Sequence, residues 1–268
     1  MATRIESHQN KILKWIKGLN QKKHRDKEGV FIAEGLRFIS EIPMDWEVRL
    51  FAASDTFSLE NDMAVYADRA ETYIMSDALF AVLSDTENPQ GILAVCKKQP
   101  LGQEKIWEKT APFFLLAEEL NDPGNLGTII RTADASGADA IFLSKGCVDI
   151  YNQKVLRATM GSIFHVPIYQ NISLEEVAHK MKENHGSLYG AHLKGTCTPY
   201  SLPLEEGCGF FIGNEARGLS DAAASLCDRW VKIPMPGQAE SLNASIAAGI
   251  LMYEVVRQRL NKPFEGTM

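Results

Sequence analysis

Residues 113–144 read FFLLAEELNDPGNLGTIIRTADASGADAIFLS, and this stretch decides the fold. The apolar run FFLLA predicts a buried strand, and the turn residues NDPG at 121–124 end it. Residues 125–137 predict a helix, because apolar side chains recur at helical spacing and Gly137 is a typical helix terminator. A second apolar run, AIFLS, follows at 140–144. Strand, helix and strand in this order predict a βαβ unit with parallel strands.

The alternation of strand and helix extends in both directions from this unit. Downstream it recurs as far as VKIPMPGQAESLNASIAAGILMYEVVRQRL, and upstream a less regular pattern covers about a hundred residues. Residues 98–112 lose periodicity and gain proline, glycine and charge, which is typical of a linker. We therefore predict an α/β protein with an N-terminal domain over 1–97, a linker over 98–112 and a second domain over 113–262.

Composition places the chain among ordinary globular proteins. It has 268 residues, of which 45% are hydrophobic and 23% are charged. No apolar run approaches the length needed to span a bilayer, and the N-terminus lacks the apolar core of a signal peptide. The five cysteines are far apart and form no CxxC pair. We expect a cytoplasmic protein with no disulfide framework and no metal site.

The charge is unevenly distributed along the chain. Residues 1–29 contain eight Lys or Arg and three acidic residues, which leaves 20 basic and 31 acidic residues, a balance of −11, for the remainder. A basic arm on an acidic body can bind phosphates, because a polyanion responds to the local field. The alternative is a solvated helix surface. Within the arm, QKKHRDKEG at 21–29 predicts a charged loop.

Three polar loops follow predicted strands, at 121–128, 213–220 and 233–242. In parallel α/β sheets, ligands bind beyond the carboxyl ends of the strands, where helix N-termini offer free N–H groups. No GxxxxGK[ST] sequence exists, so a P-loop is excluded. The glycines of GCGFFIG at 207–213 mostly precede their strand, whereas a dinucleotide fingerprint must follow one. A dehydrogenase-like nucleotide site is therefore not indicated.

Three long motifs, in order, resemble the signatures of the SpoU/TrmH family of RNA ribose 2′-O-methyltransferases in the SPOUT superfamily. They are DPGNLGTIIRTADASG at 122–137, FIGNEARGLS at 211–220 and IPMPGQAESLNASIAAGILMYE at 233–254. The segments FIAEGLRFISEI and LSDTENPQGILAV resemble the α/β/α RNA-binding domain that many members carry N-terminally. Ala216 and Ala244 depart from the usual motif residues, and neither position has a chemical role.

The resemblance implies a SPOUT parallel sheet whose C-terminal part forms a deep trefoil knot. It also implies S-adenosyl-L-methionine as cofactor, no metal, and a homodimer with the catalytic pocket near the subunit interface. Gly213, Ile233 and Leu242 would bind the cofactor, largely through backbone groups, with a contribution from the backbone of 193–196. Asn125, Arg131, Glu215, Ser241 and Asn243 would form the catalytic set.

Read without the family, these residues have simpler explanations. Asn125, Ser241 and Asn243 are favoured helix caps and turn residues. Arg131 is harder to explain, because it stands among residues that should face a sheet. A buried charge needs a partner, and Glu215 is the candidate. The family resemblance makes Arg131 the residue that meets the target 2′-hydroxyl, either as general base or by orienting it through forked hydrogen bonds.

The sequence therefore predicts an enzyme that methylates a ribose in structured RNA. Large-subunit (23S) rRNA is the first expected substrate, and tRNA is the alternative. A second alternative is a non-catalytic RNA-binding factor of ribosome assembly, against which the complete catalytic set argues. The basic arm would bind RNA phosphates. The side chains expected to do so are Lys11, Lys14, Lys22, Lys23 and Arg25.

Overall fold

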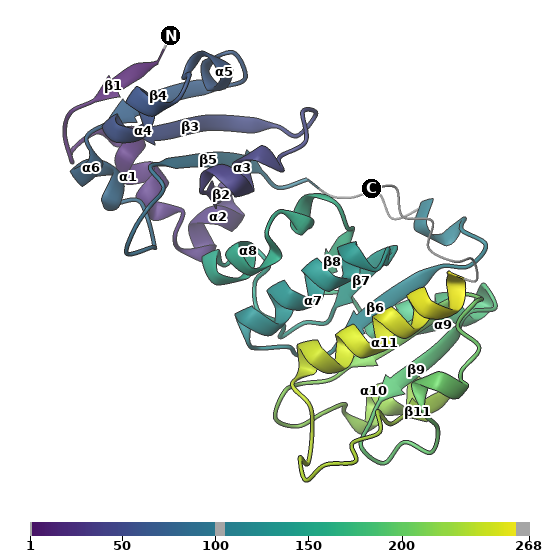
Figure 1. Cartoon of the computed structure of the whole chain (residues 1–268). Helices are drawn as coiled ribbons and strands as arrows, with labels where there is room; N and C mark the ends of the chain where they lie inside the picture. Colours follow the sequence, from purple (N-terminus) through teal and green to yellow (C-terminus); the bar gives the residue numbers. More distant parts are fainter. Residues whose placement is uncertain (1, 100–104, 261–268) are drawn as a thin grey trace. The chain divides into compact units, whose positions relative to one another are not determined.

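The computed structural model describes residues 2–99 and 105–260, and these form two compact units (Figure 1). The first comprises 2–99 together with 149–164, and the second comprises 105–148 and 165–260. No helix of the described residues is long and apolar enough to cross a membrane. The sequence interpretation assigned 149–164 to the second domain, whereas its contacts group it with the first unit. Residues 100–104 of the expected linker and 261–262 of the expected second domain lie outside the described residues.

The first unit is built on a five-stranded mixed sheet of order β1-β4-β3-β5-β2. Its strands are β1 (Thr3–Ile5), β2 (Val30–Glu34), β3 (Val48–Ser54), β4 (Glu71–Met75) and β5 (Ile92–Lys97). Its helices are α1 (Lys11–Gly18), α2 (Lys22–Glu28), α3 (Leu36–Ser40), α4 (Asp55–Glu60), α5 (Ala64–Ala67), α6 (Asp77–Ala81) and α8 (Gln153–Thr159), with a 3₁₀ turn at Ser162–Phe164. One sheet face packs on Leu13, Ile16 and Phe80 from α1 and α6.

The segment 149–164 covers aromatic side chains of the first unit. The Tyr151 ring lies 4.7 Å from that of Phe31, and the Phe164 ring lies 5.1 Å from that of Trp46, centroid to centroid. The Gln153 side-chain amide donates to the Ile32 carbonyl at 3.1 Å. This segment therefore completes the hydrophobic core of a unit that begins more than a hundred residues earlier in the chain.

Residues 22–28, expected to be a loop, form the helix α2, which ends at Gly29 with φ +66°. The reason is Arg25, whose side chain turns inward and is 3% exposed. Its guanidinium donates to the carbonyls of Leu19 and Asn20, both at 2.8 Å, and to the Asp149 carboxylate at 2.6 Å. Tertiary contacts thus stabilise a helix that its local sequence does not indicate. The same geometry contradicts the prediction that Arg25 binds RNA.

The second unit contains a six-stranded parallel sheet of order β11-β9-β10-β6-β7-β8. Its strands are β6 (Phe113–Ala117), β7 (Ala140–Leu143), β8 (Ile168–Gln170), β9 (Ser187–Ala191), β10 (Cys208–Ile212) and β11 (Arg229–Val231). Its helices are α7 (Pro123–Ala135), α9 (Leu174–Glu183), α10 (Asp221–Leu226) and α11 (Ala244–Arg259), with 3₁₀ turns at Lys105–Trp107 and Pro199–Ser201. The parallel sheet and the βαβ unit predicted around residues 113–144 are confirmed.

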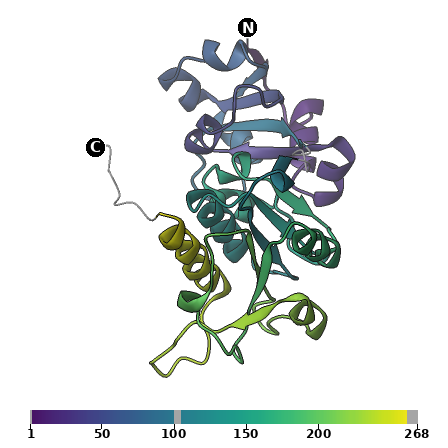
Figure 2. The same ribbon diagram turned by 90° about the vertical axis from the view of Figure 1, so that its right-hand side faces the viewer.

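Two helical layers enclose this sheet. Phe114, Leu116 and Phe142 belong to the core that includes α9 and α10, while α7 and α11 lie side by side on the opposite face (Figures 1 and 2). The α7 helix begins at its N-cap Asp122, whose carboxylate accepts from the Asn125 N–H at 2.7 Å. Because all six strands are parallel, the loops after β6, β9, β10 and β11 meet at one edge.

Candidate functional site

Three of the predicted catalytic residues are joined by hydrogen bonds at this edge. The Asn125 side-chain amide donates to Glu215 Oε1 at 3.2 Å, and the Asn243 amide donates to Asn125 Oδ1 at 2.8 Å. These residues come from α7, from the loop after β10, and from the N-cap of α11. The cluster therefore ties three loops together that are far apart in the sequence.

Glu215 holds the start of α7 through its carboxylate. Oε2 accepts from the Asn121 N–H at 3.1 Å, and Oε1 accepts from the Asp122 N–H at 3.0 Å. Partial desolvation raises the pKa of Glu215, but the backbone N–H groups of Asp122 and Asn121 and the Asn125 amide outweigh it. The net pKa lies below its ordinary value. The carboxylate is thus stabilised in its charged form by the loop that it organises.

Asn243 is both a helix cap and a member of the cluster. Its Oδ1 accepts from the Ser245 N–H at 2.9 Å, from the Ser245 hydroxyl at 2.6 Å and from the Ile246 N–H at 3.3 Å. This leaves the amide nitrogen free to donate to Asn125. Asn243 can therefore cap α11 and belong to the site at once, because the cap uses its amide oxygen and the contact with Asn125 uses its amide nitrogen.

Arg131 differs from the expectation. It is exposed on α7 rather than buried, and among the described residues it forms neither an ion pair nor a hydrogen bond through its side chain. The expected pairing with Glu215 is wrong, since that carboxylate is occupied by Asn121, Asp122 and Asn125. Arg131 lies instead on the same exposed stripe as Thr128 and Ala135. Its five N–H donors face outward and can bind a ligand.

The loop after β10 depends on Gly213. A Cβ there would lie 2.2 Å from the Gly218 carbonyl carbon and 2.3 Å from the Leu219 nitrogen, so a side chain would displace backbone. Asn214, which the sequence analysis did not single out, closes this turn. Its amide donates to the Glu119 carbonyl at 2.8 Å, and its Oδ1 accepts from the N–H groups of Ala216 and Arg217 at 3.0 and 3.1 Å. The position of an Asn just before a tight turn was the available signal.

The loop over 233–242 offers unused backbone groups. Ile233 and Leu242 are half-buried, and Ser241 is exposed. Within the described part of the chain, the backbone of this loop forms no hydrogen bond. The residue just before it does, because the Lys232 N–H donates to the Cys197 carbonyl at 2.9 Å. Ser241 makes no contact with the Asn125 cluster through a hydrogen bond. The structure thus brings together Asn125, Glu215 and Asn243, and leaves Arg131 and Ser241 outside this network.

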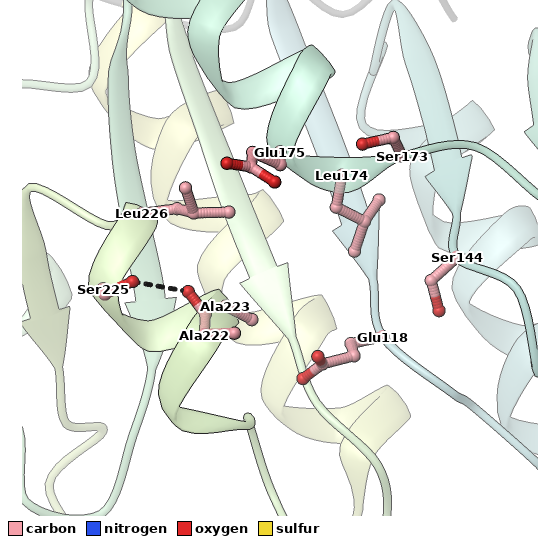
Figure 3. A pocket seen from close by; sticks show the side chains of 9 residues that line it. All are labelled: Glu118, Ser144, Ser173, Leu174, Glu175, Ala222, Ala223, Ser225 and Leu226. Carbon is pink, nitrogen blue, oxygen red and sulfur yellow. Dashed lines mark hydrogen bonds between the residues drawn. The ribbon is translucent and has the colours of Figure 1, made fainter.

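A cavity of about 320 Å³ lies on the α9 and α10 side of the sheet (Figure 3). Glu118 and Ser144 reach it from the ends of β6 and β7, and Glu175 from the start of α9. None of the predicted site residues lines it. Its two carboxylates make it unsuited to a polyanion. Glu118 also has a structural task, because it accepts hydrogen bonds from the N–H and hydroxyl of Ser220 at 2.8 and 2.6 Å.

The lowered pKa of Glu215 gives a prediction about the order of the loop at 121–125. A depressed carboxylate pKa stabilises the folded loop at pH values above the ordinary value of 4.5, and this contribution is lost as the pH falls through the lower, folded-state pKa. We expect the amide hydrogens of Asn121 and Asp122 to be protected at pH 7 and to lose protection in that acidic range. Hydrogen exchange followed by NMR measures this. In Glu215→Gln the protection should already be reduced at neutral pH, and unchanged protection in that variant would contradict the assignment.

Comparison with known proteins matches two parts of the chain to known families. Residues 112–253 match the model of the SpoU rRNA Methylase family, and residues 10–94 match an MRM3-like substrate binding domain. The chain is 35% identical to the 23S rRNA (guanosine(2553)-2′-O)-methyltransferase RlmP of Bacillus subtilis, over 94% of this chain and 98% of that one. It is 32% identical to the 23S rRNA (uridine(2479)-2′-O)-methyltransferase of Streptomyces viridochromogenes, over 97% and 94% of the two chains.

Solved structures agree with these matches. The AdoMet-bound rRNA methyltransferase from Sinorhizobium meliloti superposes with a TM-score of 0.85 at 29% identity, covering 96% of this chain and 98% of that one. The SpoU methyltransferase AviRb from Streptomyces viridochromogenes, in complex with AdoMet, also gives 0.85, at 30% identity and with 95% and 100% coverage. The family match spans more than half of the chain and includes all three loops of the site. The protein belongs to the SpoU rRNA methylase family.

Proposed function

We propose that this protein transfers a methyl group from S-adenosylmethionine to a ribose 2′-hydroxyl of 23S rRNA. The observation that carries the proposal is the Asn125–Glu215–Asn243 cluster, which fixes the start of α7 and, with it, the helix that presents the exposed Arg131. Relatives named for 2′-O-methylation of 23S rRNA match this chain over nearly its whole length. The N-terminal match to a substrate-binding domain favours a structured RNA substrate.

The loops after β9, β10 and β11 fit S-adenosylmethionine in their chemistry. Leu193, 54% exposed, and the half-buried Ile233 and Leu242 offer apolar surface suited to an adenine ring. The unused backbone groups of 233–242 can hydrogen-bond its polar edge. Gly213 permits the close approach of backbone that shapes this edge of the sheet. When bound, the cofactor supplies a methyl group activated by a positively charged sulfur.

Arg131 then acts on the acceptor side of the reaction. Arginine stays protonated at physiological pH, so its role is to donate forked hydrogen bonds rather than to remove a proton. It can hold the 2′-oxygen and a neighbouring phosphate in one orientation, and correct orientation supplies a large part of the acceleration in transfers between two bound groups. Asn125 and Asn243 position the helix that carries it. Ser241, in the loop before Asn243, would steady that loop against RNA or cofactor.

The path of the C-terminal segment supports a trefoil knot. Residues 192–207 contact the C-terminal segment 229–260 at two places. A Cβ on Gly195 would lie 2.6 Å from the Lys232 nitrogen. Farther along, Arg259 of α11 donates to the carbonyls of Leu204 and Glu206 at 3.0 and 2.6 Å. Contact of one loop with both ends of the segment 232–259 is compatible with the threaded chain end that a trefoil knot requires.

The outer surface of α11 supports a homodimer. Apart from Ser245, residues 244–253 of this helix are apolar or small on every side, and a helical stretch of that kind is normally buried all round. Leu251, Met252 and Val255 face the core, whereas Ile246 is 53% exposed and Tyr253 is 51% exposed. The helix α7, on which Arg131 is exposed, packs beside α11. A second copy covering both helices would place the catalytic residues near the subunit interface.

All four predicted RNA-binding lysines remain available in the first unit. Lys11, Lys14, Lys22 and Lys23 are exposed on α1 and α2, and none forms an ion pair within the described residues. In Lys22→Glu/Lys23→Glu we expect rRNA binding to weaken by about tenfold, with the slope of log K against log salt falling by about two. Filter binding at several salt concentrations measures both quantities. The control Lys154→Glu removes an exposed lysine outside the arm, and equal effects of the two variants would contradict a specific role of the arm.

The proposed reaction is tested by transfer of tritiated methyl from S-adenosylmethionine to RNA from a strain that lacks the gene. We expect label in 23S rRNA alone, at a linkage resistant to alkaline cleavage, which marks a 2′-O-methyl ribose. Label in tRNA instead of 23S rRNA would identify tRNA as the substrate. Cofactor binding with no label in free RNA, but with label in isolated large-subunit precursors, would move the reaction to an assembly intermediate. An absence of label and of cofactor binding would overturn the proposal in favour of a non-catalytic assembly factor.

A further inference from the structure

The second unit has an aromatic surface that the proposed chemistry does not use. The His192 and Trp230 rings are stacked, with centroids 4.7 Å apart and planes inclined by 24°. His192 follows the end of β9, and Trp230 is in the edge strand β11. Of the four tryptophans, all among the described residues, Trp230 is the exposed one, at 38%. An exposed, ordered aromatic stack of this kind offers a flat surface on which a planar ligand can stack.

Both rings are held in place by hydrogen bonds of their own. The Trp230 indole N–H donates to the Ala224 carbonyl at 2.9 Å, and His192 Nδ1 accepts from the Lys194 N–H at 3.0 Å. The backbone below them is also fixed, because Gly195 is packed against Trp230 and Lys232 too closely to admit a Cβ. The stack is therefore a rigid platform, and a ligand that binds it loses little side-chain entropy in the protein.

Three exposed cations are close to the platform residues in the sequence. Lys194, Arg229 and Lys232 are exposed, and within the described part of the chain none forms an ion pair. The nearby Asp228 does not cancel them, because its carboxylate pairs with Lys182 at 3.2 Å and accepts from the Leu188 N–H at 2.8 Å. Residues 30–268 carry a net charge of −11, so three cations without an acidic partner close to one aromatic stack are unexpected there.

We propose that the His192–Trp230 platform binds an unpaired base of the substrate RNA, with Lys194, Arg229 and Lys232 contacting the adjoining phosphates. Single-stranded RNA is recognised by stacking of exposed bases on aromatic side chains combined with cations along the backbone, and both parts are present here. This inference rests on the proposed RNA substrate and adds a contact by the catalytic unit itself. The platform adjoins residues 193–196, so a base held there would lie beside the expected cofactor loop.

The test uses the intrinsic fluorescence of the full chain titrated with a short oligouridylate RNA, comparing wild type with Trp230→Phe. We expect saturable quenching in the wild type that is lost in the variant, because Trp230 is the exposed indole. In Trp230→Ala we expect RNA affinity and the KM for rRNA to worsen by roughly 5- to 100-fold, with kcat much less affected. Lys194→Ala should weaken binding in a salt-dependent way. The control Lys109→Ala, whose ammonium pairs with Asp139, should not.

The outcomes separate this inference from the proposed function. If wild type methylates rRNA, but Trp230→Phe shows the same quenching and Trp230→Ala the same KM, then the platform does not bind RNA and the function stands. If wild type neither binds nor methylates RNA, the proposed function itself fails. A changed oligomeric state of Trp230→Ala in sedimentation, with RNA affinity unchanged, would show that the surface binds a second copy and would overturn the inference.

Discussion

Replacing Arg131 by alanine is expected to reduce the rate of methyl transfer by about 100- to 1000-fold, the usual effect of removing one preorganised donor from a reacting oxygen. The cofactor affinity and the stability of the fold should remain unchanged. The reason is the position of the side chain. It is exposed on α7, and it makes no hydrogen bond to the rest of the described protein that its removal could break. Single-turnover methylation and calorimetric titration with S-adenosylmethionine measure the two effects separately.

Two further variants define what Arg131 does. Arg131→Lys keeps the charge but not the forked donors, so it should recover only a small part of the rate if orientation is the role. Arg49→Ala is the control, because it removes an exposed arginine of the first unit that pairs with Glu28. Full activity of Arg131→Ala would remove this residue from the site. Parallel loss of cofactor affinity would instead assign it to the cofactor loops.

The sequence was sufficient to predict the central α/β architecture for a physical reason. A parallel strand buried on both faces must be an apolar run, and a helix that covers it must show apolar spacing. Both patterns are local, as in 113–144. Gly137 was recognised as a terminator on the same basis, and it has φ +72° just after α7. The convergence of the loops at 121–128, 213–220 and 233–242 also followed, because parallel topology brings the ends of strands to one edge.

The position of Arg131 could have been predicted better from the sequence. Leu126, Ile129, Ile130 and Ala133 are buried on α7, and their spacing places residue 131 on the opposite side of the helix. Neighbours in sequence are not neighbours on a helix face. The buried partner expected for Arg131 was therefore unnecessary. The Glu215 carboxylate instead accepts hydrogen bonds from the backbone N–H groups of Asn121 and Asp122. A pattern of side chains in the sequence does not indicate such bonds.

Arg25 and the segment 149–164 could not be predicted in the same way. Arg25 belongs to a run of basic residues, and only its contact with Asp149, 124 positions away, distinguishes it from them. The segment 149–164 resembles an ordinary connection between β7 and β8. Its grouping with the first unit depends on long-range packing against Phe31 and Trp46. Local patterns carry no information on such pairings.

Removing the Asp149 carboxylate is expected to have the largest effect on stability. In Asp149→Ala the free energy of unfolding of the first unit should fall by about 3–5 kcal/mol, because a buried guanidinium then loses its counter-charge. The Arg25 and Asp149 side chains are only 4% and 11% exposed, so water cannot replace the lost partner cheaply. The Tyr151 N–H would also lose its bond to Asp149 Oδ1, at 3.1 Å. Hydrogen exchange of peptides from β2 and β5, read by mass spectrometry, reports the stability of this unit within the full chain.

The first unit contains a matched control for this experiment. Asp85 pairs with Arg157 at 3.9 Å, but these side chains are 63% and 40% exposed, so Asp85→Ala should cost about 1 kcal/mol or less. Asp149→Asn should give an intermediate loss, since it keeps an acceptor for Tyr151 but not the charge. In Arg25→Met/Asp149→Leu much of the stability should return, because an apolar pair of similar size removes the unpaired charge. Equal losses in Asp149→Ala and Asp85→Ala would show that the buried pair does not hold 149–164 in the first unit.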